Sequence, residues 1–502
     1  MKELFREFKN DLPASIVVFF VALPLCLGIA LASGAPLFAG VIAGILGGIV
    51  VGSASGSTLG VSGPAAGLAV IVLTAISTLG SWEIFLLAVV LAGVLQIIMG
   101  YLRLGIIAYY FPASVIKGML TGIGLIIILK QIPHAIGYTK GDISISQLFG
   151  NSIIETITPG AIIITIISMS ILILWDSILI KKHKIFTLIQ GPLVAVLFGI
   201  LLNLLFKAQV LPFSLNEKQV VSLPVATNLQ DFLGQFRFPD WSAFLNINVY
   251  TTAFVIAIIA SLETLLCVEA TDKLDPAKRI TPTNRELRAQ GIGNIISGLI
   301  GGLPITQVIV RSSANISFGA KSKLSAISHG FLLLISAITI PAVLNLIPLA
   351  TLASILFIVG YKLAKPTIFK EQYRIGLEQF VPFLATVIAI LFTDLLRGIG
   401  VGLVFAILSI LRHNYRNPYY FHKEEYNKGE IIKIILSENV TFLNKANILQ
   451  TLNHIPSNSK LEIDGSKSLN ISHDVIEIIR DFSENAKLKN IELKVINING
   501  IS

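Results

Sequence analysis

Long apolar segments follow one another along most of the chain, and they limit the possible folds more than any other feature. Between residues 13 and 411 the sequence holds fourteen such segments. A continuous helix needs about 20 apolar residues to cross a bilayer, and an interrupted segment needs fewer. The segments cover residues 13–32, 37–52, 59–79, 84–100, 114–132, 160–179, 188–206, 249–268, 291–303, 305–318, 324–347, 351–363, 380–392 and 399–411. The pattern predicts an α-helical polytopic membrane protein with fourteen transmembrane segments.

Composition excludes the common soluble classes. Hydrophobic residues make up 54% of the 502 residues and charged residues 13%, whereas soluble chains have about 25% charged residues. So few charges cannot cover a soluble particle of this size, which excludes disorder, a disulfide scaffold and an ordinary cytosolic enzyme. Cys26 and Cys267 both lie in apolar segments, and we expect them to be small buried residues rather than disulfide partners or metal ligands.

Basic residues in the loops predict the orientation. With the N-terminus inside, nineteen Lys and Arg residues fall on the inner side and six on the outer side. Basic loops remain on the cytoplasmic side of a membrane. We therefore expect a multi-pass protein of the cell inner (plasma) membrane with both termini in the cytoplasm. The net charge of +9 follows from this topology and does not indicate nucleic-acid binding.

The segments form two groups of seven, separated by a polar stretch. Seven is an odd number, so the second group enters the membrane upside down relative to the first, as in many secondary transporters. The predicted parts are a cytoplasmic N-terminus (1–12), transmembrane repeat 1 (13–206), an extracytoplasmic connector (207–248), transmembrane repeat 2 (249–411), a linker (412–428) and a small α/β domain (429–502). In the α/β domain we expect strands at 431–436, 461–464 and 491–496, and helices at 443–453 and 473–485.

The third segment of each half is interrupted by Gly, Pro and small polar residues. The interruptions are Gly-Val-Ser-Gly-Pro-Ala-Ala-Gly at 60–67 and Gly-Leu-Pro-Ile-Thr at 302–306. Backbone without regular helix cannot face lipid, because each unpaired N–H or C=O group costs several kcal/mol there. Corresponding broken helices in the two halves therefore indicate a binding site near the middle of the membrane.

The first interruption resembles a helix start. Ser62 can cap a helix, and Pro64 suits its first turn because the missing N–H costs nothing there. The N–H groups of Ala65 and Ala66 would then point outward at the positive end of a helix dipole, which binds anions. The predicted anion-binding residues of this segment are Ser62, Gly63, Pro64, Ala65 and Ala66.

Thr306 begins the second broken segment, and Arg311 and Ser312 follow it. Two helix starts that face each other would form a positively charged cradle for an anion. The alternative is that the Gly and Pro clusters only allow helices to pack closely.

Two charged residues lie where an apolar segment should have none. A central arginine costs at least about 2.5–3.5 kcal/mol on insertion, so Arg311 should face a cavity or a partner, or else reach the cytoplasmic interface. Glu263 is the only carboxylate in segment 249–268. A desolvated glutamate can carry a proton through a transport cycle, or bind Na⁺ when ionised. A structural ion pair between Glu263 and Arg311 is the alternative.

Several motifs together resemble the SulP family of inorganic anion permeases over essentially the whole chain. They are Ala-Leu-Pro-Leu-Cys-Leu-Gly-Ile-Ala at 22–30, Gly-Pro-Ala-Ala at 63–66, Ser-Leu-Glu-Thr-Leu-Leu at 261–266 with Asp-Lys at 272–273, and Pro-Ile-Thr at 304–306 with Arg-Ser at 311–312 and Gly-Ala-Lys at 319–321. The tail is similar to a compact STAS domain, the cytoplasmic appendage of this family.

The resemblance implies a 7+7 inverted repeat with a mobile core domain and a gate domain, elevator-type transport and a homodimer. It also implies that the anion sits between the third and tenth segments, near Val310, with Leu25 and Ile29 in the pocket wall. Leu25 stands where the family often has Gln, and Ile29 where an aromatic residue is common.

The resemblance further implies a coupling-ion site at Glu263, Cys267 and Thr306. The sodium-coupled bicarbonate branch has Asp and Thr as sodium ligands at the first two of these positions. A thiol is a poor ligand for Na⁺, so we expect proton coupling, with Na⁺ at Glu263 as the second candidate.

The leading hypothesis is a secondary active transporter of a small inorganic anion, with sulfate or bicarbonate first. An uncoupled anion channel or chloride-type exchanger, and a membrane sensor that signals through the STAS domain, are the alternatives. Nucleobase permeases share the architecture, but they need further carboxylates in the tenth segment. We expect no enzyme activity, no metal and no cofactor apart from Na⁺ as a possible coupling ion. The expected partners are the anion, the lipid bilayer and a second copy of the chain, without nucleic acid.

Overall fold

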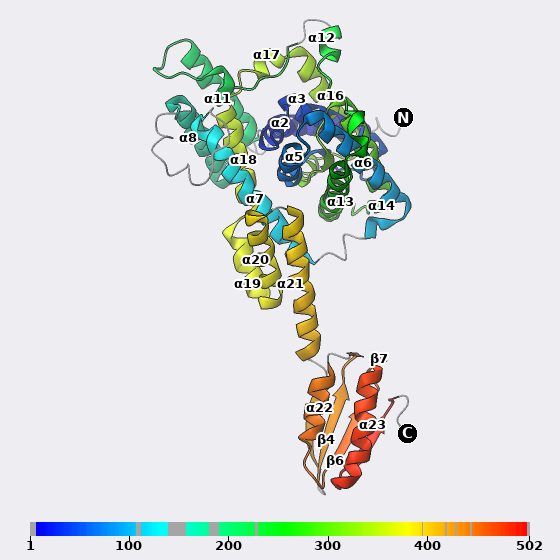
Figure 1. The fold of residues 1–502 in the computed structure, drawn as a ribbon. Coiled ribbons are helices and arrows are strands. Elements are labelled where there is room, and N and C mark those ends of the chain that lie inside the picture. Colours follow the sequence, from blue (N-terminus) through cyan, green and yellow to red (C-terminus); the bar gives the residue numbers. More distant parts are fainter. Residues whose placement is uncertain are drawn as a thin grey trace. The chain divides into compact units, whose positions relative to one another are not determined.

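A computed structural model of the chain describes residues 7–106, 112–138, 157–179, 190–225, 229–393, 395–416, 419–426, 429–441 and 444–498. The chain divides into two compact units (Figure 1). The first unit is Met1–Glu371 with Thr386–Ile399, and the second is Gln372–Ala385 with Gly400–Ser502.

Helices and short strand–helix pairs account for the first seven predicted segments. They are α2 (Phe8–Ala32), α3 (Leu37–Leu46) continued by the π-helical turn η1 (Gly47–Val51) and α4 (Gly52–Ala54), β1 (Ser62–Pro64) with α5 (Ala66–Leu79), α6 (Trp82–Tyr101), α7 (Ala113–Ile136), α8 (Pro159–Leu174) extended by η5 (Trp175–Leu179), and α11 (Gly191–Lys207). The first helix begins at Phe8, so it already includes part of the N-terminus predicted at 1–12.

The second half repeats this order. Its elements are α13 (Ile247–Leu274), α14 (Thr283–Ile300), β2 (Ile305–Gln307) with α15 (Ile309–Ser317), α16 (Leu324–Thr339) with α17 (Pro341–Leu344), α18 (Leu349–Leu363), α19 (Pro366–Ile375), α20 (Leu377–Phe392) and α21 (Leu395–Arg416). All fourteen predicted segments thus overlap an observed element. Seven helices among the described residues are long and apolar enough to cross a membrane by length and composition. The connector holds the short helices η6 (Glu217–Gln219), α12 (Leu229–Leu233) and η7 (Trp241–Leu245).

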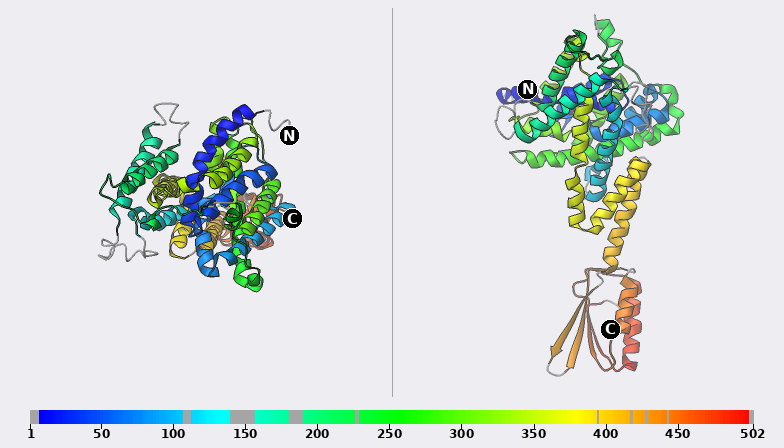
Figure 2. Two further views of the ribbon diagram at one scale, coloured as in Figure 1. Left: turned by 90° about the horizontal axis from the view of Figure 1, so that it is seen from above. Right: turned by 90° about the vertical axis from the view of Figure 1, so that its left-hand side faces the viewer.

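Within the first unit, two groups of helices lie side by side. Helices α2, α3, α5, α6, α13, α14, α15 and α16 pack around the two short strands, and α7, α8, α11 and α18 pack against one another. Both groups are visible from the front and from above (Figures 1 and 2). The most extensive contact of the first group joins α6 to α14. A Cβ at Gly93 would lie 2.6 Å from the carbonyl oxygen of Gly291, so this contact requires glycine.

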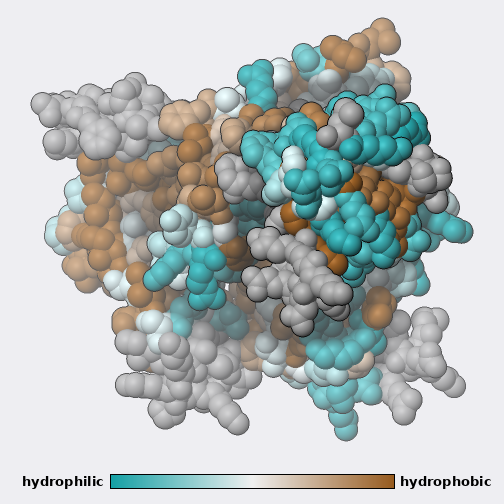
Figure 3. All heavy atoms as spheres, turned by 90° about the horizontal axis from the view of Figure 1, so that it is seen from below, coloured by the Kyte–Doolittle hydropathy of each residue, from teal (hydrophilic) through white to brown (hydrophobic). Residues whose placement is uncertain are grey.

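Much of the outer surface of the helical unit is apolar. In the space-filling view, hydrophobic side chains gather on the left, where Figure 1 places α8 and α11 (Figure 3). Ile166, Leu197 and Leu201 on these helices are 59%, 56% and 50% exposed. A soluble protein rarely exposes such a contiguous apolar surface, so this face fits a lipid environment.

The tail is a small α/β domain. Its sheet has the strand order β3 (Tyr419–Tyr426), β4 (Gly429–Leu436), β6 (Lys460–Asp464), β8 (Glu492–Ile496), in which β3 is antiparallel and the other strands are parallel. Helices α22 (Lys445–Asn453) and α23 (His473–Leu488) pack on it, and β5 (Asn439–Val440) pairs with β7 (Asn470–Ile471). The five elements expected here are confirmed.

The described residues within 412–428, the segment predicted as a linker, have regular secondary structure. Helix α21 continues to Arg416, and Tyr419–Tyr426 forms the edge strand β3. This segment pairs with β4 over eight residue pairs, from Tyr419–Leu436 to Tyr426–Gly429. Its charged residues look like a linker in the sequence, but an edge strand tolerates charges well.

Candidate functional site

Two short strands, one from each half of the chain, pair at the centre of the site and form a two-stranded ribbon. Strands β1 and β2 are antiparallel, with Ser62 opposite Gln307, Gly63 opposite Thr306 and Pro64 opposite Ile305. Helix α5 starts immediately after β1 and helix α15 immediately after β2. Because the strands are antiparallel, one helix begins at each end of a ribbon that is three residue pairs long.

The helix start predicted at Ser62 is displaced. Ser62 and Pro64 belong to β1, and the residue that precedes helix α5 is Ala65, with an extended backbone and no side-chain cap. Pairing with β2 holds residues 62–64 extended, so the chain enters the helix only at Ala66. The hydroxyl of Ser62 instead accepts a hydrogen bond from Gln290 Nε2 at 2.8 Å.

Helix α13 reaches both helix starts with one face. The N–H of Gly67, in the first turn of α5, donates to the Glu263 carboxylate. The N–H of Ile309, the first residue of α15, donates to the Cys267 sulfur. Residues four apart lie on one face of a helix, which is why Glu263 and Cys267 can serve the two starts together.

The Glu263 carboxylate fits closely against helix α5. A Cβ at Gly67 would lie 2.6 Å from Glu263 Oε1, so a side chain at this position would displace the carboxylate. Glu263 Oε2 is buried and has no hydrogen-bond partner among the described residues. One oxygen of this group is therefore available for a proton or another ligand.

Arg311 is fully buried and incompletely bonded. It lies in the first turn of α15, and its exposed fraction is 0%. Its Nη2 donates to the Cys26 sulfur at 3.3 Å, whereas Nε and Nη1 have no partner in the described part of the chain. A Cβ at Gly63 would lie 2.1 Å from Nη1, so the guanidinium lies against the middle of β1, between the two helix starts.

Among the described residues, no carboxylate balances the positive charge of Arg311. No ion pair joins it to Glu263 or to any other described carboxylate, which removes the structural ion pair considered from the sequence. His329 on α16 is also buried, interacts electrostatically with Arg311, and has an Nε2 atom without a described partner. A buried cation without a partner is costly, so this geometry suits an anionic ligand.

Comparison with known proteins shows to which family the chain belongs. The sequence matches the Sulfate permease family over residues 8–409. The chain belongs to that family. Its relatives are transporters rather than enzymes.

Two curated relatives and one solved structure illustrate the similarity. YvdB of Bacillus subtilis, a candidate sulfate transporter, is 27% identical over 81% of this chain and 74% of its own length. The bicarbonate transporter BicA of Picosynechococcus is 26% identical over 81% of this chain and 71% of its own length. The murine anion transporter Slc26a9 in its inward-facing state has a TM-score of 0.76 at 16% identity, covering 98% of this chain and 86% of that one.

The fold of this sulfate permease family member is therefore the expected one. Within the described residues, fourteen membrane-spanning segments form an inverted repeat with core and gate domains, and the C-terminal α/β domain fits a compact STAS domain.

Most of the residues predicted for the site lie together around the ribbon. Thr306 is buried in β2, and its hydroxyl donates weakly to the Gln307 carbonyl at 3.3 Å. The Ser312 hydroxyl accepts from the Val61 N–H and donates to the Val308 carbonyl, so it ties α15 to the approach of β1.

Three predicted residues have no hydrogen bond to this cluster through their side chains, because they are apolar. Val310 is 48% exposed and therefore lies on a different face of α15 from Arg311. Leu25 and Ile29 are buried on α2, but the α2 residue that contacts Arg311 is Cys26. Their role in the pocket wall stays a prediction.

Sequence reasoning missed the polar residues that hold the ribbon in place. Asn294 on α14 binds both backbone groups of Ile305, accepting from its N–H at 2.6 Å and donating to its carbonyl at 3.1 Å. Gln290, one turn earlier, links Ser62 to Glu286. The four-residue spacing of Glu286, Gln290 and Asn294 was the available signal, because it predicts one polar stripe on a helix.

Proposed function

We propose that this chain is a secondary active transporter of a small inorganic anion, sulfate or bicarbonate, that binds between the starts of α5 and α15. The observation that carries the proposal is Arg311, which is fully buried at the ribbon with two nitrogen atoms that have no described partner. An anion at this place would supply the missing hydrogen-bond acceptors and the counter-charge. The names of the relatives, which include sulfate and bicarbonate transporters, support the same substrate class.

The charge balance of the site favours proton coupling for a divalent anion. Each helix start contributes roughly half a positive charge and Arg311 contributes one. With Glu263 ionised the site carries a net charge of about +1, and with Glu263 protonated about +2. Protonation of Glu263 would therefore match the site to sulfate, and release of the proton would weaken sulfate binding.

Coupling to Na⁺ is the second possibility for the same residues. Glu263 and Thr306 offer oxygen atoms, but the third position is Cys267, whose sulfur is a soft ligand. No group of three or more His, Cys, Asp or Glu residues within the described ranges could hold a metal ion. By the same charge balance, bicarbonate, with one negative charge, would suit the site with Glu263 ionised, and a Na⁺ bound nearby would raise the net charge of the site to about +2.

Movement of one helix group past the other would provide alternating access. We call the helix group that packs around the ribbon the core group, and it includes α5, α13 and α15. The gate group beside it consists of α7, α8, α11 and α18. We place the protein in the cell inner membrane with both termini in the cytoplasm, as a homodimer. Cysteine accessibility on the two sides of right-side-out vesicles and light scattering of the purified protein would test these points.

Uptake into proteoliposomes tests the function. Labelled sulfate and bicarbonate are supplied separately, each with and without an inward gradient of H⁺ or of Na⁺. We expect accumulation driven by one of these gradients, loss of uptake in Arg311→Ala, and loss of the H⁺ response in Glu263→Gln. Normal coupled uptake in both variants would refute the site. An anion current that does not depend on an ion gradient would support the alternative of a channel or exchanger. Unchanged signalling in a variant that cannot transport would support the alternative of a membrane sensor.

A further inference from the structure

A cavity separate from the ribbon lies where α6 and α13 end and α14 begins. Its volume is about 900 Å³, and the loop between α13 and α14 forms one of its walls. Six of the residues that line it are basic, namely Arg103, Lys273, Lys278, Arg279, Arg285 and Arg288, and two are acidic. Nothing in the transport site involves these residues, so they call for a separate explanation.

The acidic residues near the cavity are already bonded within the protein. Glu269 forms an ion pair with Lys273 at 2.6 Å, and Asp272 accepts hydrogen bonds from the N–H and the hydroxyl of Thr281, both at 2.7 Å. Asp275 next to the cavity binds Arg279 at 2.6 Å, and this hydrogen bond holds the pKa of Asp275 below its usual range.

Four basic residues remain without a carboxylate partner in the part of the chain that the structure describes. They are Arg103, Lys278, Arg285 and Arg288.

Two of these guanidinium groups are held in place. Arg288 lies over the Tyr101 ring, with 5.0 Å between its Cζ and the ring centroid, and its Nε donates to the Asn284 carbonyl. Arg285 Nε donates to the Ala54 carbonyl at 3.1 Å. A guanidinium that is already oriented loses little freedom on binding, and its planar fork matches a phosphate group. The cavity is therefore organised for a phosphate rather than only surrounded by mobile charges.

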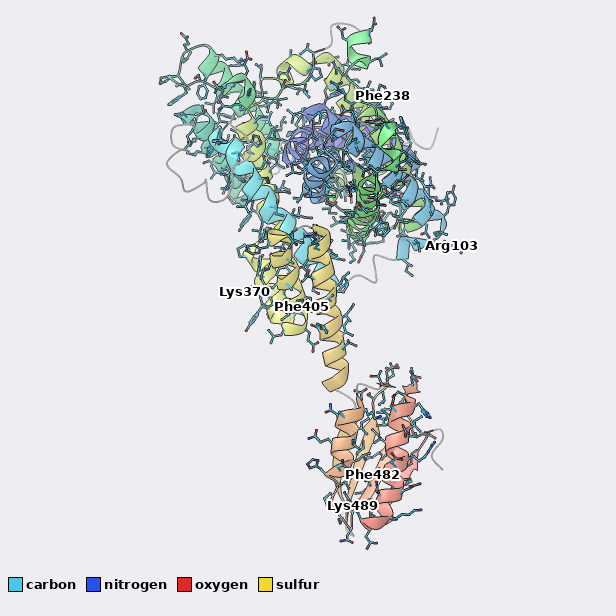
Figure 4. All side chains as sticks on the ribbon, viewed as in Figure 1. Arg103, Phe238, Lys370, Phe405, Phe482 and Lys489 are labelled. Carbon is cyan, nitrogen blue, oxygen red and sulfur yellow. The ribbon has the colours of Figure 1, made fainter. Side chains whose placement is uncertain are left out.

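Exposed aliphatic residues lie beside the cations. Ile106 and Ile280 also line the cavity, and they are 54% and 88% exposed. Arg103 follows the C-terminal end of α6, and Figure 4 shows it there; Ile106 lies three residues further along the chain. A free phosphate has no use for such side chains, whereas a phospholipid offers a phosphate and acyl chains together. Basic pockets between spanning helices on the cytoplasmic side of a membrane are a common place for anionic headgroups.

We propose that this cavity binds the phosphate headgroup of an anionic phospholipid, with the acyl chains along Ile106 and Ile280. The headgroup is bound by Arg103, Arg285 and Arg288. Lys278 adds charge from the loop.

A lipid bound in this cavity would also affect the ribbon, because the end of α13 contacts both the cavity loop and β2. Asp272 anchors the loop through Thr281, and its neighbour Thr271 accepts a hydrogen bond from Gln307 Nε2 of β2 at 3.0 Å. A headgroup that orders the loop therefore steadies the last turn of α13 where it holds β2. This consequence for transport rests on the proposed function, but binding of the lipid does not.

Native mass spectrometry of the delipidated full-length protein tests binding. Phosphatidylglycerol and phosphatidylcholine are added in separate titrations, and inorganic phosphate is added as a competitor. We compare the wild type with Arg103→Asn/Arg285→Gln, and with Lys278→Gln/Arg288→Gln in case the first variant does not fold. The control Lys365→Gln/Lys370→Gln removes the same charge from exposed positions of the same unit.

We expect phosphatidylglycerol to bind the wild type and the control equally, and each cavity variant about tenfold or more weakly, because charge-assisted hydrogen bonds are lost. Phosphatidylcholine should show no difference between the proteins. Equal binding of phosphatidylglycerol by wild type and cavity variants would overturn the proposal. Displacement of the lipid by inorganic phosphate alone would overturn the choice of a lipid and assign the cavity to a soluble phosphate.

A second measurement concerns transport. In vesicles of phosphatidylcholine with phosphatidylglycerol, anion uptake by the wild type should be faster than in phosphatidylcholine alone, and the cavity variants should lose this difference. Absence of uptake in all proteins, together with normal lipid binding, would refute the proposed function and leave the lipid site intact.

Discussion

Replacement of Arg311 by methionine should make the protein less stable than the wild type only when the anion is present. Methionine has a similar length but no charge, so Arg311→Met removes a fully buried cation that has no counter-charge in the described part of the chain. An arginine at the centre of a spanning helix costs at least about 2.5–3.5 kcal/mol. In anion-free buffer the variant should therefore unfold at the same temperature as the wild type or at a higher one.

The anion should reverse this order. Nε and Nη1 are available to an anion, and a hydrogen bond to a charged group contributes about 1.5–3 kcal/mol. Loss of both therefore weakens binding by roughly 3–6 kcal/mol, or on the order of a hundredfold or more. A ligand present at a hundred times its dissociation constant stabilises the folded state by about 2.7 kcal/mol. The wild type should gain this stabilisation in sulfate or bicarbonate, and Arg311→Met should not.

Thermal unfolding of the purified protein in detergent, followed by tryptophan fluorescence, measures both effects. The matched control is Lys370→Met, which removes a charge from an exposed position and should keep the wild-type response to the anion. An unchanged response in Arg311→Met would refute the anion site. A large loss of stability in anion-free buffer would show instead that Arg311 has a structural partner.

Three further predictions concern the surroundings of the site and the tail. Gly67→Ala should lower proton-driven uptake at least tenfold in the proteoliposome assay, because its Cβ would lie 2.6 Å from Glu263 Oε1, whereas Ala69→Gly on the same helix should have little effect. Asn294→Ala should lower the free energy of unfolding by roughly 2–5 kcal/mol, since it leaves two buried backbone groups of Ile305 unpaired, and an effect as small as that of the exposed Asn248→Ala in chemical denaturation would contradict this. Hydrogen bonds from lysines of β4 and β8 lower the pKa of Glu462 below 4.5, so its contribution to stability is present above that pH and is lost as the pH falls further. The Glu462→Gln chain should therefore show a weaker loss of stability on acidification than the wild type, and an identical acid profile would disprove the linkage.

The positions of the spanning segments could be predicted because crossing a bilayer is a local requirement. Apolar runs along the sequence locate all fourteen segments, although only seven of the described helices are long enough to cross a membrane by length and composition, and the odd number of segments in each half predicts the inverted repeat. Arg311 and Glu263 could be recognised for a related reason, since a charge in an apolar segment is visible without knowledge of its partners. The expected members of the tail sheet follow from short alternating runs in the same way. Strand β3 was missed because an edge strand needs no apolar pattern of its own.

The neutral polar residues of the site could not be predicted in this way. Gln290, Asn294 and His329 are ordinary residue types, and each is meaningful only through what it contacts. Cys26 was expected to be a small buried residue, and it is buried, but its contact with Arg311 depends on how α2 packs against α15. The helix start at Ser62 was misplaced because its sequence suits a cap, whereas pairing with β2 keeps it extended.

The sequence by itself determined the membrane environment, the number of segments, their inverted order and the two buried charges of opposite sign. Only the tertiary structure decided that these two charges do not pair: Glu263 is bonded to the start of α5, and Arg311 lies at the middle of β1. The physical reason is the ribbon, which joins Gly63 to Thr306 across the two halves of the chain. Its contacts are formed between residues distant in sequence, and no local pattern specifies which helix face will meet which helix start.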